Sequence, residues 1–509
     1  MRARRAAIIG AGMGGLAAAA DLARAGYAVE VLERAPGPGG KMRAIDSAGG
    51  FIDCGPTVMT MRWVFDALFD DCGESLDRAV TLSPLSTLAR HAWADGAGFD
   101  LFADKKQSED AIGAFAGAQE AAGYRAFCAD AENAWMALRD AHIAAQRPTP
   151  LSLTAAILRQ NPIGLAHIRP FETLWRMTAR HFRSPRLRQV FARFATYCGS
   201  SPFAAPATLA LIAHVERLGV WSVAGGMRAL AAALADLAAR QGARLRYDCE
   251  AAEIVLVRGT VSGVRLRSGE RIEADVVVFN GDADALAQGL LGDAARRAVA
   301  TAPARSLSAL TWAGCTQAHG FPLARHTVFF SDDYAAEFRA LTARPPHAPS
   351  IYVCAQDRPC VAATSAPERL FLLVNAPPRA LHADEVETCQ ANAFAHLARC
   401  GLTIDPLAMT KTTPRDFETL FPGTSGALYG APTHGWRATF RRPGARSAIP
   451  GLYLAGGSVH PGPGVPMATL SGRLAAQSIL TDGVSTRPFR KAAIAGATST
   501  RQAMTALTD

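Results

Sequence analysis

A glycine-rich turn near the N-terminus constrains the fold of this chain more than any other feature. A short apolar strand at residues 7–9 leads into the turn, and an alanine-rich helix and a second strand at residues 29–33 follow it. The turn has the spacing G-x-G-x-x-G, in which the first glycine lets the chain turn, the second lets the backbone approach a pyrophosphate and the third lets the helix pack on the strand. We predict a Rossmann-like unit with nucleotide-binding glycines Gly10, Gly12, Gly14 and Gly15.

An acidic residue at the end of the second strand narrows the choice of nucleotide. Glu33 lies 18 residues after Gly15, where its carboxylate can accept hydrogen bonds from both ribose hydroxyls and would repel a 2′-phosphate. The pyrophosphate would sit at the N-terminus of the helix. Arg2, Arg4 and Arg5 before an apolar run also resemble the start of a signal peptide. That alternative leaves the glycine spacing and the terminal acid unexplained, so we expect an adenine dinucleotide.

The composition allows two or more folding units and limits the partners. The chain has 509 residues and a net charge of +9, which favours an anionic surface such as a membrane leaflet or a nucleic acid. No recognised nucleic-acid-binding motif accompanies the charge, so we expect no nucleic-acid partner. No stretch reaches the roughly 18 consecutive apolar residues of a membrane span, so membrane contact would be peripheral. The ten cysteines form no C-x-x-C pair, which predicts reduced thiols in a cytoplasmic protein and no metal site.

Two further segments fit the second half of a dinucleotide. A glycine pair flanked by cations follows Glu33, and such a segment can bring backbone and positive charge close to a ligand. A short strand at residues 51–54 then leads into a tight turn that would place backbone beside a flat ligand. An ordinary Gly/Pro turn is the alternative interpretation of the first segment. The cofactor-binding residues predicted in these segments are Arg34, Gly39, Gly40, Lys41, Gly55, Pro56 and Thr57.

A loop rich in glycine and proline near the C-terminus is the second informative motif. A buried strand at residues 451–455 precedes this loop, and a helix of small and apolar residues at 468–480 follows it. A rigid loop before a helix N-terminus can aim N–H donors at the negative charge of a reduced flavin ring. His460 in the loop is a candidate base or ring contact, and a structural role is the alternative. The predicted cofactor contacts are Gly456, Gly457, Pro466 and Met467.

The middle of the chain changes character between residues 147 and 193. This range contains nine arginines and one acid, Glu172, and apolar residues alternate with the arginines at helical spacing. This pattern is typical of a basic amphipathic segment at a lipid surface, and equally of a core-facing helical pair with a solvated arginine face. Four strand-like stretches between residues 244 and 279 then predict a β-meander. The arginines are Arg147, Arg159, Arg169, Arg176, Arg180, Arg183, Arg186, Arg188 and Arg193.

Taken in order, these motifs resemble the phytoene desaturase family, the carotenoid desaturases of the flavin-dependent amine oxidase superfamily. The resemblance covers essentially the whole chain and is most specific in the C-terminal loop. The segment from Ala455 to Ala468 is most similar to the hydroxyneurosporene and methoxyneurosporene desaturases of purple bacteria, because Pro463 stands where phytoene desaturases more often have alanine. Lys41 stands where many relatives have arginine, and it supplies charge without a bidentate fork. The motifs are the glycine turn with Glu33, residues 39–41, 53–57, 225–227 and 460–466.

The resemblance implies an α/β fold, α+β overall. A Rossmann-like FAD-binding domain of the flavin amine oxidase and phytoene desaturase type would be joined to a mixed-sheet substrate domain with a long apolar tunnel and to a helical membrane-facing segment. FAD would bind non-covalently, with Glu33 at the adenosine ribose, the glycine turns at the pyrophosphate and the loop around Met467 at the isoalloxazine. The expected boundaries are 1–80, 221–306 and 415–484 for the FAD-binding domain, 81–146 and 307–414 for the substrate domain, 147–220 for the basic membrane-associating segment and 485–509 for a flexible tail.

The activity implied by the resemblance is FAD-dependent desaturation of an acyclic carotenoid, with a 1-hydroxylated or 1-methoxylated substrate. The sequence has no second dinucleotide fingerprint to seat a nicotinamide, so oxidation is expected. A hydride would leave an allylic carbon for the flavin with loss of a neighbouring proton, and oxygen or a quinone would be the electron acceptor. The protein would attach peripherally to the cytoplasmic side of the inner or intracytoplasmic membrane. The alternatives are a phytoene desaturase, a carotenoid isomerase, a flavin amine oxidase and a flavin-free lipid-escorting protein of the GDP-dissociation-inhibitor fold.

Overall fold

A parallel five-stranded sheet contains the N-terminal βαβ unit. The computed structural model describes residues 3–47, 49–160, 168–358 and 367–485, and the order of this sheet is β21-β13-β1-β2-β9. All neighbouring strands are parallel, and Ile8 in the central strand lies opposite Val31 on one side and Val278 on the other. The predicted Rossmann-like unit is therefore confirmed. The strands are β1 (Arg5–Ile9), β2 (Ala28–Leu32), β9 (Arg244–Arg246), β13 (Val276–Phe279) and β21 (Leu452–Leu454).

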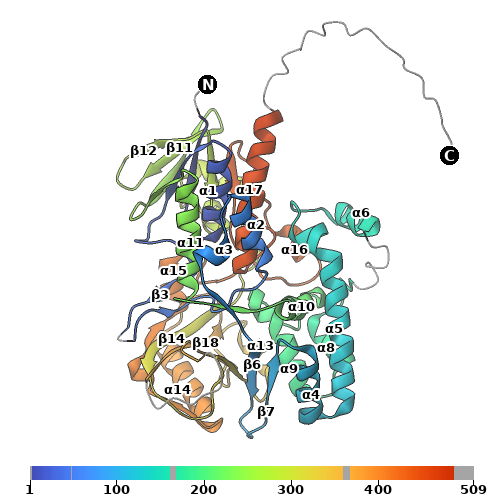
Figure 1. The fold of residues 1–509 in the computed structure, drawn as a ribbon. Helices are drawn as coiled ribbons and strands as arrows, with labels where there is room; N and C mark the ends of the chain where they lie inside the picture. Colours follow the sequence, from blue (N-terminus) through green and yellow to red (C-terminus); the bar gives the residue numbers. More distant parts are fainter. Residues whose placement is uncertain (1–2, 48, 161–167, 359–366, 486–509) are drawn as a thin grey trace, which may run out of the picture.

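Three helices rich in small residues pack beside one another against this sheet (Figure 1). They are α1 (Met13–Arg24), α11 (Met227–Arg240) and α17 (Val465–Ser485). Small residues are required because α1 and α17 approach closely: a Cβ at Gly472 would lie 1.9 Å from the Gly14 carbonyl oxygen. The alanine run after the glycine turn is fully buried in this contact and forms a packing surface.

The four strands predicted as one meander between residues 244 and 279 are divided between two sheets, so that prediction is wrong. The middle of the run, β10 (Ala251–Val257), β11 (Thr260–Leu266) and β12 (Arg271–Glu273), forms a three-stranded antiparallel sheet. Its two ends are β9 and β13 of the five-stranded sheet. The physical reason is burial: all four residues of β13 are buried, as in the centre of a parallel sheet, whereas no residue of β12 is.

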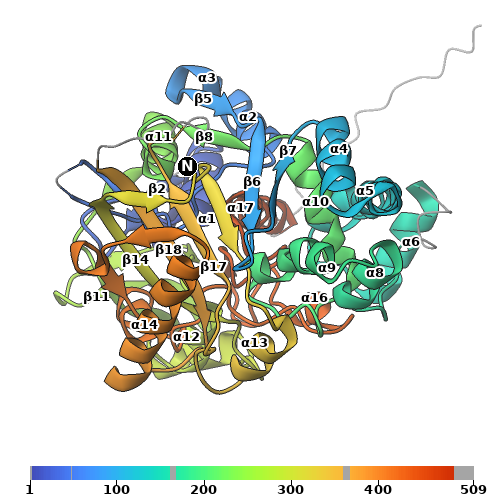
Figure 2. The same ribbon diagram turned by 90° about the horizontal axis from the view of Figure 1, so that it is seen from below.

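A seven-stranded sheet lies below the five-stranded sheet in the view of Figure 1, and α14 (Ala383–Arg399) covers its outer face (Figures 1 and 2). The order is β20-β14-β18-β17-β16-β6-β7, and every pair is antiparallel except β16 with β6. Val386 and Leu397 of α14 join Leu310 and Trp312 of β14 in one buried cluster. The strands are β6 (Thr87–Ala92), β7 (Gly98–Phe102), β14 (Ser308–Thr316), β16 (His326–Phe329), β17 (Ile351–Ala355), β18 (Glu368–Ala376) and β20 (Thr410–Thr412).

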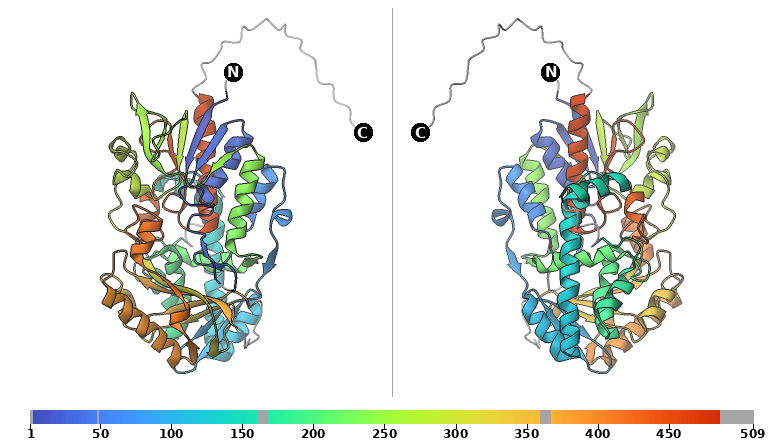
Figure 3. Two further views of the ribbon diagram at one scale, coloured as in Figure 1. Left: turned by 90° about the vertical axis from the view of Figure 1, so that its left-hand side faces the viewer. Right: turned by 90° about the vertical axis from the view of Figure 1, so that its right-hand side faces the viewer.

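Helices from residues 105–217 pack beside the seven-stranded sheet, and the right-hand view of Figure 3 shows the long α5 running along that side of the molecule. The apolar residues of α8 and α9, such as Leu174, Val190 and Phe191, are buried, so the core-facing interpretation is confirmed for these two helices. α6 differs, because Leu151 and Leu158 on it are exposed. Within the described ranges, no helix is long and apolar enough to cross a membrane. The helices are α4 (Lys105–Ala116), α5 (Ala118–Leu138), α6 (Pro150–Gln160), α8 (Leu174–His181), α9 (Pro185–Ala192) and α10 (Leu211–Arg217).

Short elements connect these units. Two small ribbons pair β3 with β4 and β5 with β8, and a third pairs β15 with β19. The expected tail from residue 485 onward lies outside the described residues, apart from Ser485 at the end of α17. The short elements are β3 (Ala44–Ile45), β4 (Ile52–Asp53), α2 (Trp63–Asp71), α3 (Leu76–Ala79), β5 (Leu82–Pro84), η1 (Arg139–Ile143), η2 (Arg193–Cys198), η3 (Ala207–Ala210), β8 (Trp221–Val223), α12 (Ala283–Ala287), η4 (Asp293–Ala298), β15 (Ala318–Gly320), α13 (Tyr334–Ala340), β19 (Leu402–Ile404), η5 (Pro406–Ala408), α15 (Pro414–Leu420) and α16 (Ala438–Arg441).

Candidate active site and cofactor pocket

A large cavity extends from the carboxyl ends of the parallel strands to the seven-stranded sheet. Gly10 after β1, Glu33 after β2, Asn280 after β13 and Gly456 after β21 all line it. Ligands of open α/β sheets bind at this edge. The cavity volume of about 1720 Å³ exceeds the roughly 300–1,000 Å³ of most small-molecule sites. The cavity therefore has room for a dinucleotide together with a second ligand.

The turn after β1 forms a cradle that only glycine fits. A Cβ at Gly12 would lie 2.8 Å from Asn280 Nδ2, and a Cβ at Gly15 would lie 2.1 Å from the Gly10 carbonyl oxygen. Gly12 is the N-cap of α1 and provides no side-chain acceptor for the first N–H groups of the helix. A helix N-terminus without a side-chain cap is suited to an anion, so the cradle fits a pyrophosphate. Gly10, Gly12 and Gly14 line the cavity, whereas Gly15 lies in the contact between helix and strand.

Asn280 organises the cradle, and sequence reasoning missed it. Its Nδ2 donates a hydrogen bond to the Gly10 carbonyl oxygen at 3.2 Å. A Cβ at Gly14 would lie 2.7 Å from its Oδ1, so the amide also sets how closely α1 approaches. The available clue was a polar residue directly after the buried apolar strand β13, since such positions meet ligands in α/β folds.

Glu33 is buried and held in place by backbone groups on both sides of the cavity edge. Its Oε2 accepts from the Ala11 N–H at 2.7 Å, and its Oε1 accepts from the Ala35 N–H at 2.8 Å. A carboxylate has about four acceptor sites, so two remain for other donors. The carboxylate lines the cavity with two acceptor sites free, which the predicted ribose contact requires.

Arg34 and Lys41 also line the cavity, and each donates a hydrogen bond to a backbone carbonyl oxygen. The acceptor of Lys41 Nζ is Leu428, at 2.6 Å. Burial lowers the pKa of Lys41, because desolvation disfavours the charged form. A bound anion would oppose this shift and keep the ammonium charged. Gly39 and Gly40 between the two cations line the same wall, with φ of +120° and +58°.

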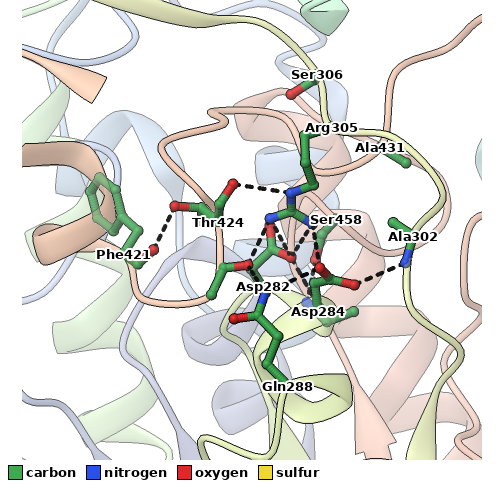
Figure 4. A network of polar contacts seen from close by, with 12 residues as sticks. Asp282, Asp284, Gln288, Ala302, Arg305, Ser306, Phe421, Thr424, Ala431 and Ser458 are labelled. Carbon is green, nitrogen blue, oxygen red and sulfur yellow. Dashed lines mark hydrogen bonds and ion pairs between the residues drawn. The ribbon is translucent and has the colours of Figure 1, made fainter. Parts of the chain in front are cut away.

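A network of buried charges joins the end of β13 to the loop at residues 423–424 (Figure 4). Arg305 lies between Asp282 and Asp284, with a nitrogen 3.3 Å from an oxygen of each carboxylate. Its Nε also donates to the Thr424 carbonyl oxygen at 3.0 Å. Asp282 lines the cavity and caps α12. Because the two acids share Arg305, the network holds this wall of the cavity rigid.

Arg442 is a buried cation beside the Gly456–Gly457 turn, and no carboxylate in the described part of the chain pairs with it. Its guanidinium donates to the carbonyl oxygens of Gly457 at 3.0 Å, Ala431 at 2.8 Å and Tyr429 at 3.2 Å. Burial lowers the pKa of Arg442. A guanidinium without a counter-ion favours a ligand that carries or develops negative charge. Sequence reasoning missed this residue, because one arginine in a loop forms no pattern.

The segments predicted to contact the flat part of the ligand meet in the same cavity. Thr57 Oγ1 lies 2.6 Å from the Tyr352 hydroxyl oxygen, which lies 2.7 Å from His326 Nδ1. This hydrogen-bonded chain connects the turn after β4 to β17 and β16 of the seven-stranded sheet. The predicted residues that line the cavity here are Gly55, Pro56, Thr57, Gly456, Gly457, Pro466 and Met467.

His460 lies behind the cavity wall and is not among the residues that line it. Its Nε2 is 3.0 Å from the Ala145 carbonyl oxygen, and its ring makes an edge contact with His142 at 4.8 Å between centroids. Burial lowers the pKa of His460 to about 4. His142, in contrast, lines the cavity. The position of His460 thus provides no support for the predicted role as a base, and its contacts are those of a packing residue.

These features define an oxidoreductase of the dinucleotide-binding flavoprotein class. They are a Rossmann-type sheet, a glycine cradle, a buried acid after the second strand and a second sheet beside a large cavity. A family model described as flavin containing amine oxidoreductase matches residues 13–480, and the chain belongs to this family. Its cofactor is FAD, whose pyrophosphate the cradle fits.

Several relatives match almost the whole chain. A hydroxyneurosporene desaturase of Rubrivivax gelatinosus is 49% identical, and the match covers 99% of this chain and 98% of the relative. A hydroxyneurosporene desaturase of Cereibacter sphaeroides is 44% identical over 93% of this chain and 97% of its own. A solved oxidoreductase from Methanosarcina mazei shares the fold, with a TM-score of 0.58 at 16% identity, covering 94% of this chain and 100% of that one. Putrescine oxidase bound to putrescine gives a TM-score of 0.57 at 14% identity, covering 94% and 99%.

Glu33→Ala should weaken FAD binding, because it removes the acceptor for the ribose hydroxyls and two supports of the cradle. Hydrogen bonds to a charged group are each worth about 1.5–3 kcal/mol, so we expect the Kd for FAD to rise by about 10- to 100-fold. Titration of the apoprotein with FAD, followed by flavin fluorescence, measures this. Glu74→Ala, which removes a surface partner of Arg240, is the matched control. An unchanged Kd in Glu33→Ala would contradict the ribose role.

Three buried histidines should make the stability fall in acid. Burial lowers the pKa of His142 and His326 to about 3 and that of His460 to about 4, whereas unfolded histidine titrates near 6.5. Below pH 6.5 the unfolded chain therefore binds more protons, and stability is lost as the pH falls. We expect each histidine to cost about 2 kcal/mol of unfolding free energy between pH 6.5 and 5.

Urea unfolding of His460→Gln at the two pH values tests this, because the variant should lose about 2 kcal/mol less than the parent. His319→Gln, at an exposed histidine, should behave like the parent. Equal pH dependence in all three proteins would show that the buried ring does not titrate as expected.

Proposed function

We propose that the protein is an FAD-dependent desaturase that introduces a conjugated C=C bond into an acyclic carotenoid, with 1-hydroxylated or 1-methoxylated carotenoids as its substrates. The similarity to hydroxyneurosporene desaturases, at 44–49% identity over 93% or more of the chain, carries this proposal. The 1-hydroxycarotenoid 3,4-desaturase of a Flavobacterium, at 29% identity over 94% of the chain, supports the same substrate class.

The apolar part of the cavity supports a long polyene as substrate. Beyond the glycine cradle its walls come mainly from aliphatic and aromatic side chains of α10, η3, α13 and the seven-stranded sheet. A polyene has no polar groups along its chain, so burial of apolar area drives its binding. An amine substrate would require polar or negatively charged contacts instead. The apolar lining includes Leu209, Leu211, Ile212, Val215, Val220, Val328, Phe330, Phe338, Ile351 and Phe371.

In this mechanism the chain positions two ligands and excludes water. FAD, when bound, supplies the hydride acceptor of the oxidation. Glu33 and the cradle hold the nucleotide, and Arg442 provides positive charge beside Gly457 where a ligand gains electrons. The apolar walls would keep water away from the allylic carbon, and the charge that hydride loss leaves on the substrate would be delocalised over the polyene. We propose oxygen or a quinone as the final electron acceptor.

We further propose that α6 and residues 168–171 contact a membrane surface. Leu151 and Phe171 are 84% and 78% exposed, and Leu158 is exposed as well. Neighbours in the same segment, Leu153 and Ile168, line the cavity. Exposed apolar side chains next to the cavity suit docking on a lipid surface, from which a carotenoid could enter directly. Figures 1 and 2 show α6 projecting from the side of the molecule.

The FAD-loaded protein should convert hydroxyneurosporene delivered in liposomes, because this carotenoid carries the oxygenated end group of the proposed substrates. Each new conjugated bond shifts the polyene absorbance to longer wavelength and lowers the mass by one H₂. Parallel incubations with phytoene and neurosporene serve as comparisons. Conversion of phytoene but not of hydroxyneurosporene would favour a phytoene desaturase. Conversion without loss of hydrogen, under anaerobic conditions with reduced FAD, would favour an isomerase, and oxidation of amines alone would favour an amine oxidase.

The double variant Leu151→Glu/Phe171→Glu should bind liposomes less tightly, because it places two charges in the proposed apolar contact. We expect the affinity for anionic liposomes to fall by about tenfold. The fraction of protein that sediments with the liposomes measures this affinity. Leu407→Glu is the matched control, because Leu407 is 90% exposed on η5, far from this segment in the chain. If the double variant sediments with liposomes to the same extent as the parent and the control, the proposed membrane contact is wrong.

A further inference from the structure

Arg193 turns inward from the basic segment of residues 147–193. It begins η2, directly after α9, and of the nine arginines in that segment, all of them within the described ranges, it is the one that lines the cavity. Other arginines of the segment pair with acids at the surface, as Arg186 does with Asp95 and Arg180 with Glu172. A positive charge in a predominantly apolar wall is costly unless a ligand or a nearby acid offsets it.

The structure holds the Arg193 guanidinium in one orientation. Its Cζ lies 5.3 Å from the centroid of the Tyr197 ring, one turn further along η2. Tyr197 is fixed in turn, because its hydroxyl donates to Glu216 Oε1 at 3.0 Å. Tyr197 and Glu216 line the same cavity. Tyr197 and the carboxylate together stabilise the cation, and the carboxylate accepts no hydrogen bond from it.

Most donors of this guanidinium have no acceptor in the protein. Its Nε is buried without a partner, and among the described residues no carbonyl or carboxylate oxygen accepts a hydrogen bond from it, so the Tyr197 hydroxyl is its one polar contact. Every other buried cation of the cavity wall described above has acceptors: Lys41 has a carbonyl oxygen, and Arg442 has three. A guanidinium has five N–H groups and no acceptor, so it recognises an oxygen with a free lone pair.

The location of Arg193 connects it with the site of oxidation. Burial lowers its pKa, but the nearby Tyr197, Glu216, Tyr334 and Tyr352 outweigh burial, so the pKa is raised and the charge is retained. Tyr352 is the central member of the hydrogen-bonded chain that begins at Thr57, beside the predicted flavin contacts. The cation therefore lies where the apolar part of the cavity approaches the cofactor-binding part.

We propose that Arg193 binds the oxygen at the hydroxylated or methoxylated end of the carotenoid and so selects oxygenated over unsubstituted substrates. This inference rests on the proposed function. Both a hydroxyl and a methoxyl oxygen can accept from a guanidinium, whereas an unsubstituted end group would leave the buried donors unpaired. A site that must satisfy buried donors rejects a substrate lacking the acceptor, which is a stronger source of selectivity than apolar contact.

Arg193→Met tests the inference, because it keeps most of the side-chain volume and removes all donors. We expect the preference for hydroxyneurosporene over neurosporene to fall by about 10- to 100-fold, both in kcat/KM and in the ratio of Kd values. Binding is measured without turnover, from quenching of tryptophan fluorescence by the polyene. Arg193→Lys, which keeps a charged donor, should retain part of the preference. Arg240→Met, which removes a surface arginine paired with Glu74, should retain all of it.

The outcomes separate this inference from the proposed function. If Arg193→Met weakens both carotenoids equally, or alters FAD content or the flavin absorbance without changing the preference, Arg193 supports the fold or the cofactor and the inference is wrong. If the parent enzyme converts hydroxyneurosporene but shows no preference in either measurement, the inference fails and the proposed function stands. If the parent converts neither substrate yet binds the hydroxylated one with an Arg193-dependent preference, the proposed function fails and the inference stands.

Discussion

Close backbone contact at Gly14 holds the nucleotide-binding half of this protein together. A Cβ there would lie 2.7 Å from Asn280 Oδ1, 2.8 Å from the Ala468 carbonyl oxygen and 2.9 Å from the Gly456 nitrogen. The βαβ unit, the end of β13, the loop after β21 and the start of α17 thus meet at one point. Because these segments are far apart in the chain, the cofactor site exists only when all of them have come together. No side chain can occupy this point, so the contact also excludes alternative packings of the helices.

Charge is distributed unequally between the two parts of the cavity. In the cofactor-binding part, Asp282 and Asp284 share Arg305, whereas among the described residues Lys41 and Arg442 have only carbonyl oxygens as hydrogen-bond acceptors. Two cations that pair with no carboxylate of the described chain suit a pyrophosphate and a ring that gains electrons. The other part is apolar, so a polyene displaces little ordered water there. Arg193 interrupts this apolar wall, and its unused donors are best explained by an oxygen on the substrate.

The predictions from sequence identified residues of the cavity wall where their position depends on local backbone geometry. The glycine turn, Glu33 at the end of a strand, and the Gly/Pro loop before a helix are each contained within a few residues, and each lines the cavity as expected. They failed where burial in the folded state decides. The strands at 244–279 belong to two sheets, because β13 is fully buried and β12 is not. His460 resembled a catalytic residue by its loop, yet it packs behind the wall.

The sequence by itself determined the class of nucleotide and the type of fold, because spacing of glycines and the position of an acid are local properties of the chain. Tertiary structure alone decided which polar residues face the ligands. Asn280, Arg442 and Arg193 belong to no motif, and arginines occur throughout the segment that contains Arg193. Only the packing of α9 and η2 against the sheets separates the arginine that faces the cavity from those that pair with acids at the surface. The glycine turn can thus be recognised in the sequence alone, whereas the positions of the cations beside it depend on the fold.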